Sequence, residues 1–492
     1  MIVNIPSSQG GLNLKDSLDA MDIRYAIQMD NILPDTNRDT LRQGCRQITT
    51  MSAKTLMTYT KKGMETLLCA IDGNIYKLNA DNTRTLLKSG FSGDNWQYCS
   101  FTDASGNINT ILTNGTTDNA QRVYDNGGTL TIADAYNSAT SLNSPCSYKN
   151  RLYFAVNDSL KIKHSAVQAI NGNLTETNLA GIFRLGGHIV ALANWTQNAG
   201  TGMANLFCIL TSEGEVAVYS GLSPEDADWS LVGVFRISKP IGNNCVCQLG
   251  GDLIVITQDG FLPLSEVLSQ DRANKVEISD KINPVVEGKN FNGIWGVYYY
   301  SKRAWLIVNT PSTDTGHTQE QYVLVRNTGG WCRFVGWDAF CFATLGDNLY
   351  FCNGTGIYLA DVGNSDNGKK ITYYLQKAYT QLDIPEVKQV LLVRERNKTL
   401  GQETIGTRIG VDFKLEDSAS RLVQLEGTQT YWDTAIWDVS FWSDERPITQ
   451  LKTPIFSNFG NFISVGVLGQ SAKALEFYGL QAKIKVGTGD TW

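Results

Sequence analysis

The amino-acid sequence predicts an all-β protein whose main body is an irregular β-propeller of about seven blades. The first reason is a unit of two short apolar strands and a tight turn, which recurs at intervals of 41–55 residues. The second is that the stretches between these units show β patterning only. Such a period is typical of propellers, because one blade cannot bury both of its faces and a closed ring of blades can.

Seven copies of the unit can be counted. Four are clear, and their turns carry Asp, Gly or Asn: residues 65–78, 205–219, 252–265 and 347–360. Three looser copies lie at 109–125, 150–165 and 304–325. Asp72, Glu213 and Asp259 each precede a glycine in these turns, where Asp and Gly serve the turn itself. We therefore interpret them as turn residues and not as catalytic carboxylates.

The ends of the chain lack the repeat. Residues 1–48 show no sustained strand alternation and predict an N-terminal arm laid over the fold, with a short helix around 16–29. The propeller is predicted for residues 49–382. Within it, residues 273–288 interrupt the β pattern, and Ser279 could cap a short helix with Ile282 and Val285–Val286 facing inward.

Residues 383–492 predict a third unit, a β-rich domain resembling a sandwich. Several segments alternate apolar and polar residues without the propeller period. Trp432, Trp437 and Trp442 are spaced by five, so successive ones point to opposite faces of a strand. One face is then core, and the other is either an aromatic cap or a subunit interface.

Charge and cysteine content restrict the class of protein. The net charge is −6 and the only dense basic stretch is 392–398, which we interpret as a solvated strand edge. A protein that grips nucleic acid usually presents a basic face.

The ten cysteines are scattered without metal-ligand spacing, which favours buried free thiols over disulfides or a metal site. Free thiols indicate folding in a reducing cytosol. Neither a signal peptide nor an apolar run long enough to span a membrane is evident.

Motifs for catalysis are missing or broken. The three histidines, His164, His188 and His317, are far apart in sequence, and there is no nucleophile elbow. The stretch 363–370 nearly spells a phosphate loop, but Lys370 stands where Ser or Thr should hold magnesium. Residues 92–96, SGDNW, are similar to the aspartate box of sialidase-type propellers but occur once. We therefore predict no enzyme, no catalytic or metal-binding residues, and no cofactor.

Several stretches resemble the tail-hub or nozzle proteins of short-tailed, podovirus-type phages, the group that includes packaged-DNA stabilisation proteins. The opening stretch 10–45 carries the Asn31-to-Pro34 step followed by Arg42 and Gly44. Residues 321–361 are the most similar stretch. The others are 148–165, 257–282, 431–442 and 459–467, so the resemblance touches nearly the whole length.

The resemblance implies a virion structural protein of the phage tail, made in the cytoplasm of the host bacterium. Its implied partners are five more copies in a homohexameric ring, the adaptor and portal-side proteins of the head-to-tail connector, tail fibres or tailspikes, and a plug or needle protein. Contact with viral double-stranded DNA would be transient and non-specific during ejection. The loops at 114–119, 198–203 and 312–319 are polar insertions in which functional residues would be found.

Two other classes stay open at this point. A glycan-binding or glycan-cleaving propeller, such as a receptor-binding tail protein, predicts carboxylates or aromatic residues converging at one end of the propeller axis. A scaffold propeller for peptide partners predicts a monomer with a grooved face. The ring interpretation predicts self-assembly instead.

Overall fold

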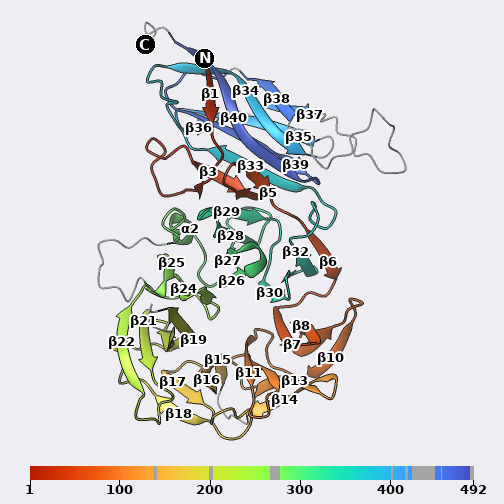
Figure 1. Cartoon of the computed structure of the whole chain (residues 1–492), viewed down its shortest axis with the longest axis vertical. Helices are drawn as coiled ribbons and strands as arrows, with labels where there is room; N and C mark the ends of the chain where they lie inside the picture. Colours follow the sequence, from red (N-terminus) through yellow and green to blue (C-terminus); the bar gives the residue numbers. More distant parts are fainter. Residues whose placement is uncertain are drawn as a thin grey trace.

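The computed structural model describes residues 1–136, 141–198, 203–265, 278–399, 403–415, 419–423, 449–455 and 457–487. Almost all of the regular structure in these residues is β. Figure 1 shows a ring of small sheets with a second β body attached to its rim, and both chain termini lie at the far end of that second body. The predicted fold class, a β-propeller with an additional sandwich-like domain, is confirmed.

The first four blades are four-stranded antiparallel sheets, each formed by consecutive strands. Blade 1 contains β7 (Thr55–Lys61), β8 (Met64–Ile71), β9 (Asn74–Leu78) and β10 (Arg84–Ser89). Blade 2 contains β11 (Gln97–Thr102), β12 (Ile108–Thr113), β13 (Ala120–Asn126) and β14 (Thr129–Tyr136). Blade 3 contains β15 (Leu142–Tyr148), β16 (Arg151–Val156), β17 (Lys161–His164) and β18 (Thr175–Asn178). Blade 4 contains β19 (Ile189–Asn198), β20 (Met203–Thr211), β21 (Glu215–Ser220) and β22 (Ser230–Arg236).

The remaining three blades depart from this pattern. Blade 5 has three strands among the described residues, β23 (Val246–Leu249), β24 (Asp252–Thr257) and β25 (Gly260–Pro263). Blade 6 contains β26 (Gly296–Tyr300), β27 (Trp305–Pro311), β28 (Gln319–Val325) and β29 (Gly330–Val335). Blade 7 contains β30 (Cys341–Leu345), β31 (Asn348–Asn353) and β32 (Gly356–Ala360). Its fourth strand is β6 (Cys45–Thr49), which pairs with β32 and closes the ring with residues from the start of the chain.

The blades form where the sequence alternates an apolar strand with a tight turn. In blade 1, Asp72 and Gly73 both have positive φ (49° and 73°), the backbone of a tight hairpin turn between β8 and β9. The last six residues of β8 are all buried. Its Leu68 and Ala70 pack with Trp96, Leu112 and other residues of blade 2, so the core lies between blades. This arrangement is why a blade depends on its neighbours.

The second body is a sandwich of two sheets. In the part of the chain that the structure describes, the outer sheet has six strands: β1 (Ile2–Ile5), β4 (Ile32–Pro34), β5 (Asp39–Leu41), β34 (Lys388–Thr399), β38 (Thr449–Pro454) and β40 (Leu475–Val486). The other sheet includes β33 (Ile371–Lys377), β35 (Glu403–Val411), β36 (Lys414–Leu415), β37 (Ala419–Val423) and β39 (Ile463–Ser471). Val393, Ile405, Val465 and Phe477 are among the buried residues between them.

The second sheet continues into the propeller. From β33 it passes to β3 (Tyr25–Asp30) and β2 (Gly11–Leu12), and β2 pairs with β29, the outermost strand of blade 6. The result is one sheet with eleven described strands, called here the shared sheet, that spans both bodies. Such continuous backbone pairing restricts rotation of the sandwich relative to the propeller.

The predicted arm, residues 1–48, is therefore distributed over several sheets and forms no core of its own. Its strands complete the outer sheet, the shared sheet and blade 7. β33, in the span predicted for the propeller, pairs with β3 and β39. The helix expected around 16–29 is wrong, because β3 occupies Tyr25–Asp30. The helix expected near 279–288 is a single turn, α2 (Pro284–Glu287), and its N-cap residue is Asn283, not Ser279. Ile282 and Val286 are buried, and Val285 is half-buried.

Arg42 lies where the arm, blade 6 and blade 7 meet. Its side chain is fully buried and forms a bidentate ion pair with Asp366, at 2.9 and 2.7 Å. It also donates to Asn31 Oδ1 at 2.8 Å and to the carbonyl of Val335 at 3.2 Å. Two residues on, Gly44 passes so close to Ser365 that a Cβ would lie 2.0 Å from its carbonyl oxygen. These contacts hold β6 in register beside β32.

We predict that Arg42→Ala lowers the free energy of unfolding by about 3–5 kcal/mol, because it leaves the Asp366 carboxylate without its cation in a largely buried site. The matched control is Arg46→Ala: Arg46 lies on β6 but is exposed, so the loss should stay within about 0.5 kcal/mol. Chemical denaturation followed by circular dichroism measures both. Equal losses in the two variants would contradict the anchoring role of Arg42.

Candidate functional site

The axis of the propeller is occupied by side chains from all seven inner strands. Each blade contributes at least one residue to this axial site: Leu56, Tyr98, Pro145, Leu192, Val246, Tyr298 and Phe342. The space between them is about 270 Å³, room for about nine water molecules at about 30 Å³ each. The space along the axis is lined by both polar and apolar side chains and is too small for a nucleic-acid duplex.

Gln97, in blade 2, links blade 3 to the segment that leads into blade 5. Its Nε2 donates to the carbonyl of Asn243 at 2.9 Å, and its Oε1 accepts from the backbone N–H of Ser144 at 2.7 Å. Ser144, which has a φ of 47°, in turn accepts from the N–H of Leu192 at 2.7 Å through its Oγ. Hydrogen bonds therefore link blades 2, 3 and 4 to the segment that leads into blade 5, and they fix the inner ends of these blades.

A second cavity, with a volume of about 590 Å³, lies in a cleft between the propeller and the sandwich. Its walls come from the 312–319 loop, from β29 and the connection after it, from β3, and from β33 with the turn that precedes it. The lining carboxylates are Asp30, Asp314, Asp338 and Asp366, and the lining cations are Arg333, His317, Lys369 and Lys370. This cleft is the strongest candidate for a small-ligand site in the described part of the chain.

Arg333 is the centre of the cleft's charge network. Its guanidinium binds Asp30 at 2.6 and 2.8 Å, Asp314 at 2.9 Å and the buried Glu320 at 3.3 Å. Glu320 also binds Lys289 at 2.5 Å, and burial lowers the pKa of that lysine. These shared partners connect β3 and the 312–319 loop to β28 and β29, so removal of any one of them would leave a charge without its counter-ion.

The remaining lining carboxylates are also held. Asp338 accepts from the N–H groups of Thr318 and Gln319, at 2.7 and 3.2 Å, and lies 3.1 Å from His317 Nδ1. Asp366 is the partner of Arg42. A general base or nucleophile needs a carboxylate free to meet a substrate. The four lining carboxylates instead connect one wall of the cleft to another.

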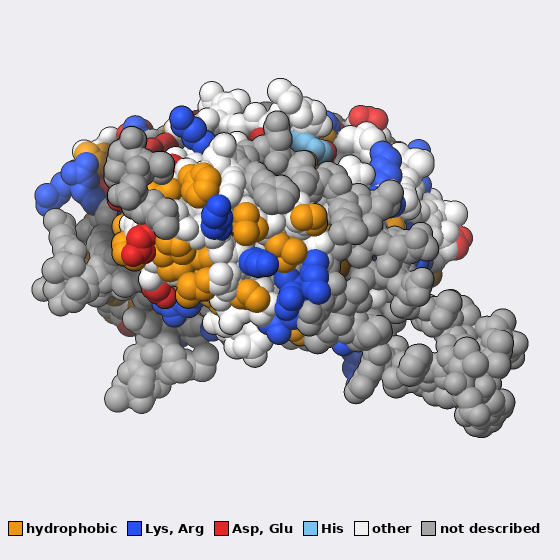
Figure 2. Space-filling view, turned by 90° about the horizontal axis from the view of Figure 1, so that it is seen from above, with side chains coloured by type: hydrophobic (Ala, Val, Ile, Leu, Met, Phe, Trp, Pro, Cys, Tyr) orange, Lys and Arg blue, Asp and Glu red, His pale blue; other side chains and the backbone are white. Residues whose placement is uncertain are grey.

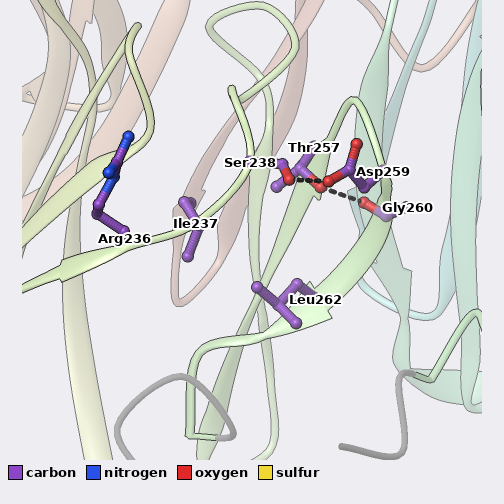
Figure 3. Close-up of a pocket in the computed structure, with 7 residues that line it drawn as sticks. All are labelled: Arg236, Ile237, Ser238, Thr257, Asp259, Gly260 and Leu262. Carbon is purple, nitrogen blue, oxygen red and sulfur yellow. Dashed lines mark hydrogen bonds between the residues drawn. The ribbon is translucent and has the colours of Figure 1, made fainter. Parts of the chain in front are cut away.

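A smaller pocket of about 270 Å³ lies between the end of β22 and the β24–β25 hairpin (Figure 3). Asp259 lines it, as one of the Asp–Gly turns identified in the sequence. Its carboxylate accepts a hydrogen bond from Ser238, and Thr257 Oγ1 donates to the carbonyl of Gly260 at 2.9 Å. The Thr257 contact lies within the turn, whereas the Asp259 carboxylate ties the turn to the segment after β22.

The three histidines lie apart from one another and have different surroundings. His164 is buried in blade 3 and stacks on Tyr153, with ring centroids 5.5 Å apart, and burial lowers its pKa. His188 precedes β19, and His317 lies in the cleft beside Asp338. The structure does not bring them together. Within the described residues, no group of three or more His, Cys, Asp or Glu side chains could hold a metal ion.

The other predicted features can also be located. Residues 363–370 form the turn before β33, as expected for a broken phosphate loop. Trp96 of the SGDNW stretch is buried beside the axial site. The loop at 312–319 lines the cleft, and Asn114 in the 114–119 loop binds Asp118 at 2.6 Å. Residues 199–202 of the third loop and the three tryptophans lie outside the described residues.

The prediction of free thiols is confirmed for all ten cysteines, of which Cys99 and Cys247 are half-buried and the others buried. Burial raises the pKa of Cys69 and of Cys146 to about 12, so these thiols stay protonated and unreactive at neutral pH. In the described part of the chain, no helix is long and apolar enough to cross a membrane.

The interpretation of 392–398 as a strand edge is wrong. These residues lie in β34, which pairs with β38 on one side and β40 on the other. Arg394 and Arg396 face outward, whereas Glu395 is buried between the two sheets. Arg42 was noted in the sequence only as part of the resemblance, and Arg333, its counterpart at the junction, was not singled out at all. An arginine at an inward position of an apolar strand, as in the WCRFV of β29, is the signal that could have identified Arg333.

No protein-family model and no curated protein sequence matches the chain. Similar solved structures include virginiamycin B lyase from Staphylococcus aureus, at 10% identity and a TM-score of 0.42, covering 64% of this chain and 96% of that one. The extracellular domain of a one-component system from B. thetaiotaomicron is 10% identical, with a TM-score of 0.40, over 68% of this chain and 45% of that one. Raptor from Chaetomium thermophilum is 14% identical, with a TM-score of 0.43, over 66% and 28%. These likenesses carry no inference about activity.

Glu395 gives a prediction about pH. Burial raises its pKa from 4.5 to about 7, and Thr407 Oγ1 donates to its carboxyl group. The folded state therefore binds the proton more tightly than the unfolded state. The stability that this proton contributes is complete below pH 4.5 and is lost as the pH rises to 7. Glu395→Gln removes this dependence, so relative to wild type it should gain about 3 kcal/mol between pH 4.5 and 8.

Urea unfolding of the two proteins across this pH range measures the difference. Glu287→Gln, at an exposed position on α2, serves as the control and should follow wild type at every pH. A stability difference between Glu395→Gln and wild type that does not change with pH would contradict the assignment.

Proposed function

We propose that the chain is a structural protein of a phage virion, a tail hub or nozzle subunit that assembles as a homohexameric ring below the portal and adaptor. In this role it would line the path of DNA exit, help to retain packaged DNA and then allow its release. Tail fibres or tailspikes and a plug or needle protein would be its other partners. The proposal comes from the sequence resemblance, and several features of the fold support it.

The proposal is supported mainly by one observation, the place in the fold of the residues on which the resemblance is based. Asn31, Arg42 and Gly44 of the N-terminal stretch meet at the point where the propeller closes and joins the sandwich. Asn31 has a φ of 59° and its side chain binds backbone groups of Val335 and Thr372. The stretch 321–361 includes Arg333 and most of blade 7. Features shared with a structural family thus have structural roles here.

Rigidity also suits a protein that must withstand the pressure of packaged DNA. The shared sheet connects both bodies through backbone hydrogen bonds. The buried pair Lys377–Asp39, at 2.7 Å with both side chains about 1% exposed, and the Arg333 network add polar contacts that tolerate little displacement. A joint of this kind transmits load from the propeller to the sandwich.

Because side chains fill the axis of the propeller, a DNA path could not run through a single copy. Since the space inside one propeller is about 270 Å³, DNA would pass between copies, along the axis of a ring. Each copy has a net charge of −6, and an acidic or neutral lumen does not hold phosphate, so DNA would slide through it.

Electron microscopy of intact virions tests the proposal. We expect six copies of the chain around the tail axis, in contact with an adaptor ring. A peripheral position at a fibre, or its absence from particles, would contradict it. If the purified protein instead binds or cleaves glycans, and a substitution in the cleft such as Asp314→Asn abolishes this, the glycan-active class is favoured.

A further inference from the structure

Two cysteines of blade 7 lie side by side. Cys341 is the first residue of β30, and in the strand register it is directly opposite Cys352 of β31. Their Sγ atoms are 3.2 Å apart. Directly opposed residues of antiparallel strands have Cα atoms about 4.5–5.5 Å apart, which is within the range of about 4.4–6.8 Å that a disulfide spans. The two thiols can therefore form a disulfide without a rearrangement of either strand.

The surroundings hold the two sulfurs in place. The Cys341 Sγ accepts a hydrogen bond from the backbone N–H of Leu56 at 3.1 Å, across the seam between blade 7 and blade 1. Both cysteines belong to an apolar core that these two blades share, together with Ala343 and Ile357. Because such cores are close-packed, their side chains have little room to change rotamer. The sulfurs thus stay within reach of each other.

The pair is shielded from bulk solvent but borders the axial site. Cys341 is 7% exposed and Cys352 is 0% exposed. The end of the molecule seen in Figure 2 belongs to the sandwich, whereas β30 lies in the propeller, well away from that end in Figure 1. Cys341 lines the axial site, whose volume of about 270 Å³ has room for several molecules the size of water or hydrogen peroxide. A small oxidant in this site therefore meets Cys341 first.

Exposure alone would select other thiols for oxidation. Cys99 and Cys247 are half-buried, whereas the other eight cysteines are buried. A disulfide, however, needs a second thiol within bonding reach, and Cys341 has one at 3.2 Å. Exposure and proximity therefore predict different products of oxidation.

We propose that Cys341 and Cys352 are a reversible redox site, a dithiol that closes to a disulfide and cross-links β30 to β31. The Cys341 thiol takes one oxygen atom from hydrogen peroxide and becomes a sulfenic acid, and the peroxide leaves as water. The Cys352 thiol then attacks the sulfenic sulfur, so that an S–S bond forms, the S–O bond breaks and a second water leaves. A dithiol reductant reopens the disulfide and is itself oxidised to one.

The cross-link acts where the ring of blades closes. β31 pairs with β32, and β32 pairs with β6, the strand that the N-terminal segment supplies. A disulfide between β30 and β31 restricts the unfolded chain and so favours the folded hairpin. Oxidation therefore stabilises the blade that completes the propeller.

The redox site goes beyond the proposed function and rests on it only for the place where oxidation happens. A chain that folds in a reducing cytosol keeps both thiols. A chain released in a virion meets an oxidising medium only after assembly, and its pair closes there. The disulfide then stabilises the finished particle without interfering with folding.

Mass spectrometry of the full-length protein tests the site. Reduced protein is treated with an equimolar amount of hydrogen peroxide, free thiols are alkylated in urea, and the protein is digested with trypsin without reduction. Cys341 and Cys352 lie in one tryptic peptide, 334–369, which contains no other cysteine. We expect this peptide to lose two hydrogen atoms and to carry no alkyl group. Dithiothreitol before alkylation should restore both alkyl groups.

The matched control is Cys69→Ala, because Cys69 lies in the same apolar core but outside the pair. This variant should form the disulfide as wild type does. Cys352→Ala removes the second thiol, so it should accumulate a sulfenic acid at Cys341, which dimedone traps. The products from wild type and Cys69→Ala decide the matter even if Cys352→Ala is less stable.

Urea unfolding tests the effect on stability. The unfolding midpoint of wild type should rise by about 0.5 M or more on oxidation, and dithiothreitol should reverse the rise. The midpoint of Cys352→Ala should not rise. A disulfide that forms without raising the wild-type midpoint would overturn the stabilising role.

Two products would overturn the site itself. They are oxidation of Cys99 or Cys247 while peptide 334–369 keeps both thiols, and a disulfide between Cys69 and Cys341. Alkylation of purified virions separates the site from the proposed function. If the chain is in the tail with both thiols reduced, closure in the particle is wrong and the proposed function stands. If the purified protein closes the pair but the chain is absent from virions, the function is wrong and the redox site stands.

Discussion

Blade 7 has three strands of its own, and the chain supplies the fourth from residues 45–49, some 300 positions earlier. This pairing of β6 with β32 closes the ring, and each inter-blade core depends on a closed ring because a blade is covered only by its neighbours. The same N-terminal segment reaches β6 after passing through the outer and shared sheets. Closure of the propeller and attachment of the sandwich are therefore one structural event, fixed where Arg42 meets Asp366.

Much of the propeller could be predicted from the sequence because its signal is local. Hairpins such as 65–78 contain both strands and their turn, so alternation and the Asp72–Gly73 pair are enough to identify them. The N-terminal segment could not be predicted in this way. Strands such as β2 and β5 have two or three residues, too few for a period, and each has one partner strand that lies hundreds of residues away.

The cleft and its charge network also could not be predicted from the sequence. The 312–319 loop was recognisable as a polar insertion, but its neighbours Asp30 and Asp366 come from distant segments. Likewise, the stretch 392–398 was noticed for its charge and misplaced at an edge, because strand order in a sheet is not encoded by the strand itself. Only the register of β34 with β38 and β40 shows that its cations join Lys452, Lys483 and Lys485 on one face.

The central claim is that the N-terminal segment belongs to the cooperative core of the whole protein. Native-state hydrogen–deuterium exchange tests it directly, by comparing β6 and β3 with inner strands such as β8. The account predicts that amides of β6 and β3 exchange with the same protection as β8, because they open only when the protein unfolds globally. Exchange in β6 as fast as in a frayed terminus, with β8 still protected, would contradict it.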